Sequence, residues 1–227
     1  MRTTTALFSA LLASLLGRTT HAQILGTDGL VYTNGLAIVN SPSPESTFQA
    51  GSVIPIAVDI SGNGRLDANT TTAGSTKPTR IDSLEIYLVS LQAKLNLTVT
   101  SGSGLLTQEP NSAVKHLNFT VSTCIPAGPY NLTFYEAAHI NNQSYFSITP
   151  LPVLVSNDHP TDACSNGTNT LQSVPQKSSP PPQSPWLNGS SVTTVAFATA
   201  TGSTATVHAV RLASALVAPV FTLLLWL

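Results

Sequence analysis

The sequence predicts an all-β fold, an immunoglobulin-like β-sandwich of about seven to nine short strands, followed by a disordered Ser/Thr/Pro-rich stalk. Three observations support this prediction. Short runs rich in Val, Ile, Leu and Tyr recur through residues 23–157, several of them alternate with a period of two, and no segment shows a sustained helical stripe. About 130 residues with this spacing are typical of a sandwich with one core. The predicted strands are Leu30–Tyr32, Leu36–Val39, Val53–Ile60, Leu84–Val89, Leu95–Thr100, Val114–Val121, Tyr130–Tyr135, Tyr145–Ile148 and Val153–Val155.

The alternation assigns a face to each strand residue. In the strand predicted over 84–89, Leu84, Ile86 and Leu88 share one face. Two Asn-Gly pairs, Asn34-Gly35 and Asn63-Gly64, directly follow such runs. They predict tight hairpin turns with positive φ.

Residues 1–22 have the features of a secretory signal peptide. Arg2 is followed by the apolar stretch Ala6–Leu16, and Ala22 offers a small residue before the cut, so Gln23 would start the mature chain. The alternative is a membrane anchor, but a stretch of eleven residues is too short to cross about 30 Å of hydrocarbon.

Residues 205–227 are predicted to be a glycosylphosphatidylinositol (GPI) attachment propeptide. A cluster of small residues precedes a spacer and the apolar tail Leu212–Leu227, and no basic flank follows the tail. The candidate attachment residues are Ala200, Gly202 and Ser203. The alternative is a retained single-span helix.

Residues 158–204 are predicted to form the stalk. They are rich in Ser, Thr and Pro, and residues 165–204 carry Lys177 as their single charge. Such a composition cannot bury enough apolar area to offset its ordering entropy, and in a secreted chain it is typical of an O-glycosylated spacer.

Sequons for N-glycosylation are unusually frequent. They occur at Asn69, Asn96, Asn118, Asn131, Asn142, Asn166 and Asn188. Three of these asparagines, Asn96, Asn118 and Asn131, lie within predicted strands and must therefore face solvent, since a glycan cannot fit into a packed interior. The same register sends Leu97, Phe119 and Leu132 inward, together with Leu95, Val99, Leu117, Val121 and Phe134.

The two cysteines, Cys124 and Cys164, form an even pair in a chain addressed to an oxidising compartment. We predict a disulfide between them, with Cα atoms within about 7 Å. By chain entropy the closed loop would contribute about 4 kcal/mol.

The composition argues against nucleic-acid binding. Formal net charge is −1 and only 8% of residues are charged, so the basic stripe needed for nucleic-acid binding is absent. No cofactor is indicated.

Three arrangements of residues could carry chemistry. Asp59, Ser61, Asn63 and Asp67 resemble the opening of a calcium loop, but Thr70 stands where a bidentate Glu is needed and Arg65 adds a cation, which favours a simple turn. A histidine at the mature N-terminus can bind copper through its amine and its ring nitrogen. His21 would stand there only if the signal were cut after Thr20, and His116, His139 and His159 show no ligand spacing.

Glycan hydrolysis would need two convergent carboxylates, and no spacing singles out a pair among Glu85, Glu109 and Glu136. Gly102-Ser103-Gly104 lacks the frame of a nucleophile elbow. The sequence therefore favours a protein that is not an enzyme.

Four segments in order resemble a known family. They are Gly51–Ile60, Leu84–Val89, Ile125–Glu136 with its Ile-Pro-x-Gly-x-Tyr start, and Ser144–Ile148. Over roughly residues 40–150 the chain is similar to the Kre/Knh-like, Ser/Thr-rich GPI-anchored cell-wall proteins of fungi. This resemblance implies an immunoglobulin-like N-terminal sandwich and a role in cell-wall assembly, particularly of β-1,6-glucan. It supplies no catalytic residues.

The sequence thus predicts a non-catalytic, GPI-anchored glycoprotein of the plasma-membrane surface or cell wall, involved in wall organisation. Its expected partners are the membrane, through the lipid, and cell-wall glucan. The alternative is a glycan-binding module or adhesin, which an exposed stripe of aromatics on one sheet face would favour. A polysaccharide-active enzyme is a third, less favoured reading, and nothing indicates an oligomeric state.

Overall fold

The computed structural model describes residues 22–26, 29–67, 70, 72–109, 112–161, 164, 168–171, 179–181, 186 and 192–196. These residues are mostly strand, and the single helix among them is one turn long, so no described helix could cross a membrane. The elements are β1 (Ala22–Gly26), β2 (Val31–Tyr32), β3 (Ile38–Ser41), β4 (Thr47–Gln49), β5 (Val53–Asp59), β6 (Arg80–Ser90), β7 (Leu95–Thr100), α1 (Gly104–Thr107), β8 (Val114–Thr120), β9 (Gly128–Ile140), β10 (Gln143–Ser156) and β11 (Val192–Ala196).

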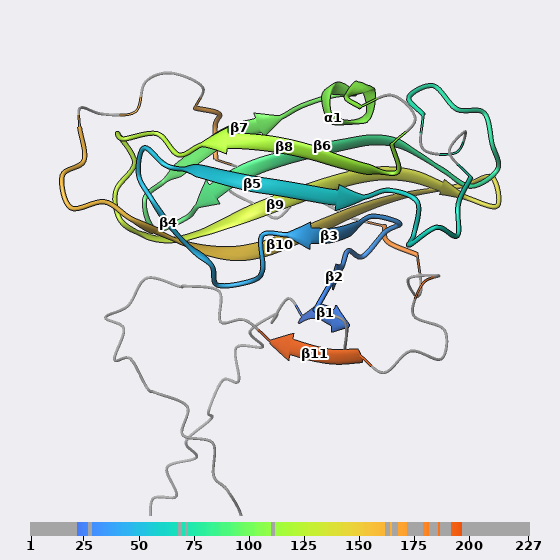
Figure 1. Cartoon of the computed structure of the whole chain (residues 1–227), viewed down its shortest axis with the longest axis horizontal. Helices are drawn as coiled ribbons and strands as arrows, with labels where there is room; N and C mark the ends of the chain where they lie inside the picture. The colour runs from blue at the N-terminus through green and yellow to red at the C-terminus, as the bar shows by residue number, and fades with distance from the viewer. Residues whose placement is uncertain are drawn as a thin grey trace, which may run out of the picture.

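Two sheets form a sandwich (Figure 1). The first sheet has the order β11-β1-β2-β3-β5-β8 and the second has the order β4-β10-β9-β6-β7. The inward faces of β5 and β6 join one core, in which Ile54, Ile56 and Val58 pack with Leu84, Ile86 and Leu88. The all-β, two-sheet prediction is therefore confirmed.

Strand number and length differ from the prediction. The described residues contain eleven strands, and three of them have 11, 13 and 14 residues. Two predicted strands merge into β10 across Pro150 and Pro152. The N–H groups of Phe146 and Leu154 on this strand donate to Ser179 and Ser46, away from β9. The backbone N–H groups of every second residue of a strand face the same side, so an N–H at position 150 or 152 would also face away from β9. The two prolines therefore remove no hydrogen bond from the ladder with β9.

The side chains lie on the predicted faces, but the predicted exposure and burial are found only in part. Leu97 and Leu132 are buried, Asn118 is exposed, and Asn96 and Asn131 are half-buried on the outer side. Phe119 is only half-buried, because β8 is the edge strand of its sheet, although it packs against the core as expected. Asn142 is exposed in the turn between β9 and β10. Asn69, Asn166 and Asn188 lie outside the described residues, as do the signal segment up to residue 21 and the candidate attachment residues Ala200, Gly202 and Ser203.

The two Asn-Gly pairs behave differently. Asn63 and Gly64 have the predicted positive φ, but they form a turn after β5 rather than a hairpin between paired strands. Asn34-Gly35 does connect the paired strands β2 and β3, yet neither residue has positive φ. Gly35 instead leaves room for the Glu136 carboxylate, which a Cβ at this position would meet.

The Asp59 turn supports the simple alternative over a calcium loop. The Asp59 carboxylate accepts hydrogen bonds from the N–H groups of Ser61 and Asn63 and from the Ser61 hydroxyl, at 2.7–2.9 Å. This carboxylate therefore stabilises its own turn.

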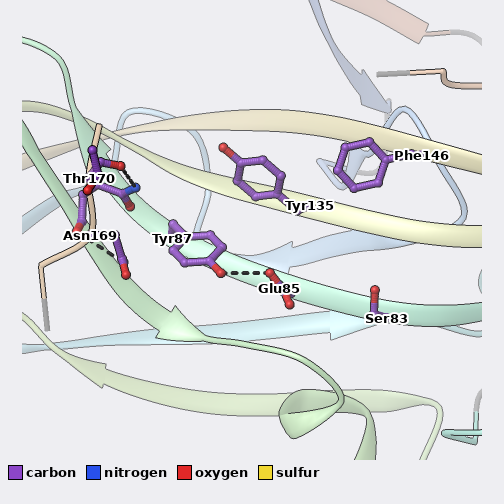
Figure 2. Close-up of a pocket in the computed structure, with 8 residues that line it drawn as sticks. Ser83, Glu85, Tyr87, Tyr135, Phe146, Asn169 and Thr170 are labelled. Carbon is purple, nitrogen blue, oxygen red and sulfur yellow. Dashed lines mark hydrogen bonds between the residues drawn. The ribbon is translucent and has the colours of Figure 1, made fainter. Parts of the chain in front are cut away.

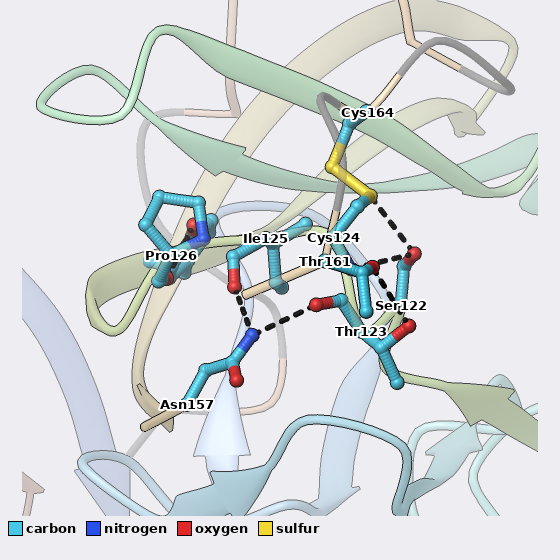
Figure 3. The surroundings of a disulfide bond; sticks show 9 residues. Ser122, Thr123, Cys124, Ile125, Pro126, Asn157, Thr161 and Cys164 are labelled. Atoms are coloured by element: carbon cyan, nitrogen blue, oxygen red, sulfur yellow. Dashed lines mark hydrogen bonds between the residues drawn. A yellow bond between two sulfur atoms is a disulfide. The ribbon is translucent and has the colours of Figure 1, made fainter. Parts of the chain in front are cut away.

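The predicted disulfide is present. Cys124 and Cys164 are bonded, with Cα atoms 5.2 Å apart and a sequence separation of 40 (Figure 3). Next to it, the Asn157 amide donates to the carbonyl oxygens of Thr123 and Ile125. The bridge and this amide hold the chain after β10 against the loop that precedes β9.

Several described residues of the predicted stalk lie on the sandwich. Thr168 pairs with Leu97 at the edge of β7, Ser179 pairs with Phe146 on β10, and β11 pairs with β1. Trp186 is only 6% exposed, and its indole N–H donates to the Leu36 carbonyl at 2.6 Å. At these positions the chain follows the sandwich instead of extending away from it, because strand edges and one large aromatic side chain supply contacts that composition alone does not predict.

Candidate functional site

Three aromatic rings gather on the outer face of the second sheet. Tyr87 projects from β6, Tyr135 from β9 and Phe146 from β10 (Figure 2). The Tyr87 and Tyr135 rings are 5.4 Å apart and perpendicular, and the Tyr135 and Phe146 rings are 6.3 Å apart and tilted by 36°. The rings therefore form walls at different angles rather than one flat platform.

These rings line a pocket of about 390 Å³, open to solvent, whose size lies at the small end for small-molecule sites. Its other lining residues are polar: Ser83, Glu85, Asn96, Asn169 and Thr170. Among the described residues that line the pocket, Glu85 carries the one formal charge. The pocket combines apolar walls with a hydrogen-bonding rim.

Glu85 is fixed by two donors. The Tyr87 hydroxyl donates to one carboxylate oxygen and the Gly102 N–H to the other, both at 2.8 Å. Burial, the hydrogen bond to Glu85 and the nearby negative charge raise the pKa of Tyr87 to about 12, so its hydroxyl remains a donor at neutral pH. Burial also raises the pKa of Tyr135.

The polar rim joins β7 to residues beyond the disulfide. The Asn169 N–H donates to the Asn96 carbonyl at 2.7 Å, and its side-chain amide donates to the Thr98 hydroxyl at 2.8 Å. The Asn96 amide in turn donates to the Thr170 carbonyl at 3.3 Å (Figure 2). Composition places residues 168–171 in the predicted stalk, so it gives no sign that Asn169 and Thr170 line a pocket.

Local sequence explains why the rings meet. Alternation along β6 sends Leu84 and Ile86 inward and therefore Glu85 and Tyr87 outward. On β9, Phe134 points inward and Tyr135 outward, and Tyr135 lies opposite Glu85 in register. The sequence indicates only that an aromatic stripe would favour glycan binding, because which rings meet depends on the pairing of β6, β9 and β10.

The three candidate carboxylates do not converge. Glu85 lies on the outer face of the second sheet, Glu136 points into the core, and Glu109 follows α1, where its carboxylate contacts His116 at 3.0 Å. The arrangement therefore offers no pair for glycan hydrolysis.

Glu136 is buried, with 1% exposure, and is held by the loop between β2 and β3. It accepts hydrogen bonds from the Leu36 N–H at 2.5 Å, the Ala37 N–H at 3.2 Å and the Thr33 hydroxyl at 3.0 Å. Burial raises the pKa of this carboxyl, while the three donors oppose that shift. A Cβ at Gly35 would stand 2.5 Å from the carboxylate, which explains the glycine.

The histidines make separate contacts. The part of the chain that the structure describes contains no group of three His, Cys, Asp or Glu side chains that could hold a metal. His116 contacts Glu109, and the backbone N–H of His159 is bonded to Asn157. His139 lies between Asp82 and Ser144, an arrangement that the sequence does not signal because three strands contribute to it.

Comparison of the sequence with protein families and with curated proteins finds no match. Among solved structures, the fibronectin(III)-like modules of Clostridium thermocellum CbhA align at 19% identity with a TM-score of 0.28. The alignment covers 53% of this chain and 46% of that one, so the chain spans less than half the length of its structural neighbour. The fold assignment rests on the strand pairing described above.

Proposed function

We propose that this protein is a cell-surface glycoprotein that takes part in cell-wall organisation by binding a neutral glycan in the Tyr87–Tyr135–Phe146 pocket. One observation carries the proposal: three of the aromatic residues that could form a binding stripe meet on one outer sheet face, with polar side chains around them. A sugar ring has apolar C–H faces and a rim of hydroxyls. Aromatic walls and a polar rim complement both.

The charge and shape of the pocket narrow the ligand class. Glu85 would repel uronic acids and phosphorylated sugars, and none of the described residues that line the pocket is a Lys or Arg that could attract them. Perpendicular rings cannot both stack on one flat ribbon of sugars. The pocket therefore suits a short neutral segment, such as a chain end or a branch, better than a long flat chain.

Location belongs to the same proposal. The signal segment, the small-residue cluster before an apolar tail, and the sequons together support a secreted chain held by a GPI lipid. The resemblance to Kre/Knh-like proteins supports a fungal wall, an immunoglobulin-like form of the sandwich, and glucan as the first polymer to test.

The test is binding of the secreted, folded chain to a glycan array and to insoluble cell-wall glucan. We expect Tyr135→Ala and Tyr87→Ala each to weaken binding about tenfold, equivalent to about 1.4 kcal/mol. Tyr87→Phe keeps the ring but removes the hydroxyl, so it should lose less.

Leu154→Ala is the matched control. Leu154 is a large exposed side chain on the same sheet but outside the pocket, and its loss should leave binding unchanged. Binding that survives Tyr135→Ala intact, or that falls equally in Leu154→Ala, contradicts the proposed site.

A further inference from the structure

Three polar side chains form a hydrogen-bonded chain on the same outer sheet face as the aromatic pocket. The Ser144 hydroxyl lies 2.9 Å from Nε2 of His139, and Nδ1 of the same ring lies 2.6 Å from an Asp82 carboxylate oxygen. The other Asp82 oxygen accepts from Nε of Arg80 at 2.8 Å. The order of atoms, hydroxyl to Nε2 and Nδ1 to carboxylate, is that of a nucleophile, its base and the group that orients the base.

Strand pairing explains why the three side chains meet. Ser144 on β10 lies directly opposite His139 on β9. Two residues along β10, the backbone N–H and carbonyl of Phe146 both bond to Ser179 and not to β9. Phe146 and its partner Ala137 are therefore a non-hydrogen-bonded pair. Such pairs alternate along the ladder, so Ser144 and His139 form the next one. Side chains of such pairs stand closest together.

Asp82 reaches the ring because β6 is irregular at this point. The pairing of β6 with β9 shifts between Ile81 and Ser83, which leaves Asp82 as the extra residue on its strand. Bulges of this kind re-aim a side chain. Arg80 holds the other oxygen of this carboxylate.

The Ser144 site is accessible. Ser144 is exposed, while the side chains of His139 and Asp82 are 23% and 35% exposed, enough to be held yet reached by substrate. By the alternation along β10, the N–H of Ser144 points away from β9, as that of Phe146 does. That N–H can donate to an oxyanion formed at the carbonyl carbon that Ser144 attacks.

We propose that Ser144, His139 and Asp82 hydrolyse carboxylic esters, with O-acylated sugars as the substrate class. The hydroxyl oxygen of Ser144 attacks the ester carbonyl carbon, and its proton passes to Nε2 of His139. The bond between the carbonyl carbon and the sugar oxygen breaks as His139 returns this proton to the sugar oxygen, which leaves an acyl group on Ser144.

Water completes the cycle. It attacks the acyl carbon, gives a proton to His139 and releases the carboxylic acid as the Ser144 oxygen leaves and recovers that proton. Ester and water thus become alcohol and acid, with no other reactant. This esterase activity would go beyond the non-catalytic role that the sequence predicts.

The choice of an acylated sugar rests on the proposed glycan pocket. Phe146 lines that pocket and lies two residues from Ser144 on the same face of β10, about 7 Å along the strand. An acyl group on a sugar held against Phe146 would lie beside the Ser144 hydroxyl.

The experiment uses the full secreted chain, a fluorophosphonate probe that labels activated serines, and p-nitrophenyl acetate, a small ester that needs no glycan pocket. We expect label on Ser144 in peptide maps and measurable ester hydrolysis. Ser144→Ala should lose both. His139→Gln should lower kcat/KM at least about 100-fold, the contribution of a general base.

The matched control is Asn142→Gln. Ser144 is also the third residue of the Asn142 sequon, so Ser144→Ala removes that sequon too, whereas Asn142→Gln removes it and leaves the hydroxyl. Asn142→Gln should keep label and activity. Absence of label on Ser144, or equal hydrolysis by Ser144→Ala and wild type, overturns the proposal, whereas glucan binding tests the pocket separately.

Discussion

Tyr135 and Glu136 are neighbours on β9, yet they belong to two opposite environments. Tyr135 faces outward and lines an open pocket beside Glu85, whereas Glu136 faces inward and is enclosed by the loop of residues 33–37. Each environment contains one glutamate. In the pocket the carboxylate has a hydroxyl and an N–H as donors and keeps access to solvent, and in the core every donor to Glu136 comes from one loop about 100 residues away in sequence.

The comparison suggests a division of roles. A fully buried carboxylate without a cationic partner is tolerated because its donors are fixed, and losing it leaves those donors unpaired. A half-exposed carboxylate at a pocket rim is easily replaced by water. Glu136 should therefore matter for stability, and Glu85 for recognition.

The largest expected effect is that of Glu136→Ala. The Leu36 N–H, the Ala37 N–H and the Thr33 hydroxyl would lose their acceptor inside the core. At about 1–3 kcal/mol for each buried unpaired donor, the free energy of unfolding should fall by about 3 kcal/mol or more. Chemical denaturation measures it, and a loss no greater than that of Glu85→Ala would contradict the proposed role of the loop.

The pH dependence of stability is the next largest effect. Burial raises the pKa of Glu136 above the unfolded value of 4.5, so between these two values the folded chain holds a proton that the unfolded chain has released. Stability contributed by this group is complete below pH 4.5 and is lost as pH rises through the folded pKa, by at most about 1.4 kcal/mol per pH unit.

Glu136→Gln tests this assignment because it keeps the size and a carbonyl acceptor but cannot titrate. Unfolding midpoints measured from pH 4 to 8 should decline with pH in the wild type more than in this variant. Parallel curves for the two proteins would mean that folding does not raise the pKa of Glu136.

These same strands show which features can be predicted from the sequence. Alternation placed Leu97 and Leu132 inward and Asn118 outward, and the even cysteine count gave the Cys124–Cys164 bridge. Period two reports only the face on which a side chain lies, and an isolated pair of cysteines in a secreted chain has one partner each. Both predictions needed no knowledge of which strands are neighbours.

The remaining features depend on contacts between distant segments. The pocket needs β6, β9 and β10 side by side, and the Ser144–His139–Asp82 chain needs the same three strands in one register. Trp186 lies in a Pro-rich stretch whose composition predicts an extended chain, but its ring packs against Gly62 and beneath Arg65. A lone Trp among small polar residues was the available signal, since such a side chain gains much from burial.

The smallest expected stability effect is that of Glu85→Gln, which sharpens the comparison from the other side. The variant keeps a side-chain oxygen for the Tyr87 hydroxyl or the Gly102 N–H, and solvent can satisfy the donor left over. The free energy of unfolding should therefore change by less than about 1 kcal/mol. Removing the charge should, however, relax the selection against acidic sugars, so retention of uronic-acid-containing glycans on the array should rise relative to neutral ones. A variant as unstable as Glu136→Ala, with unchanged glycan preference, would show that Glu85 serves the fold rather than the pocket.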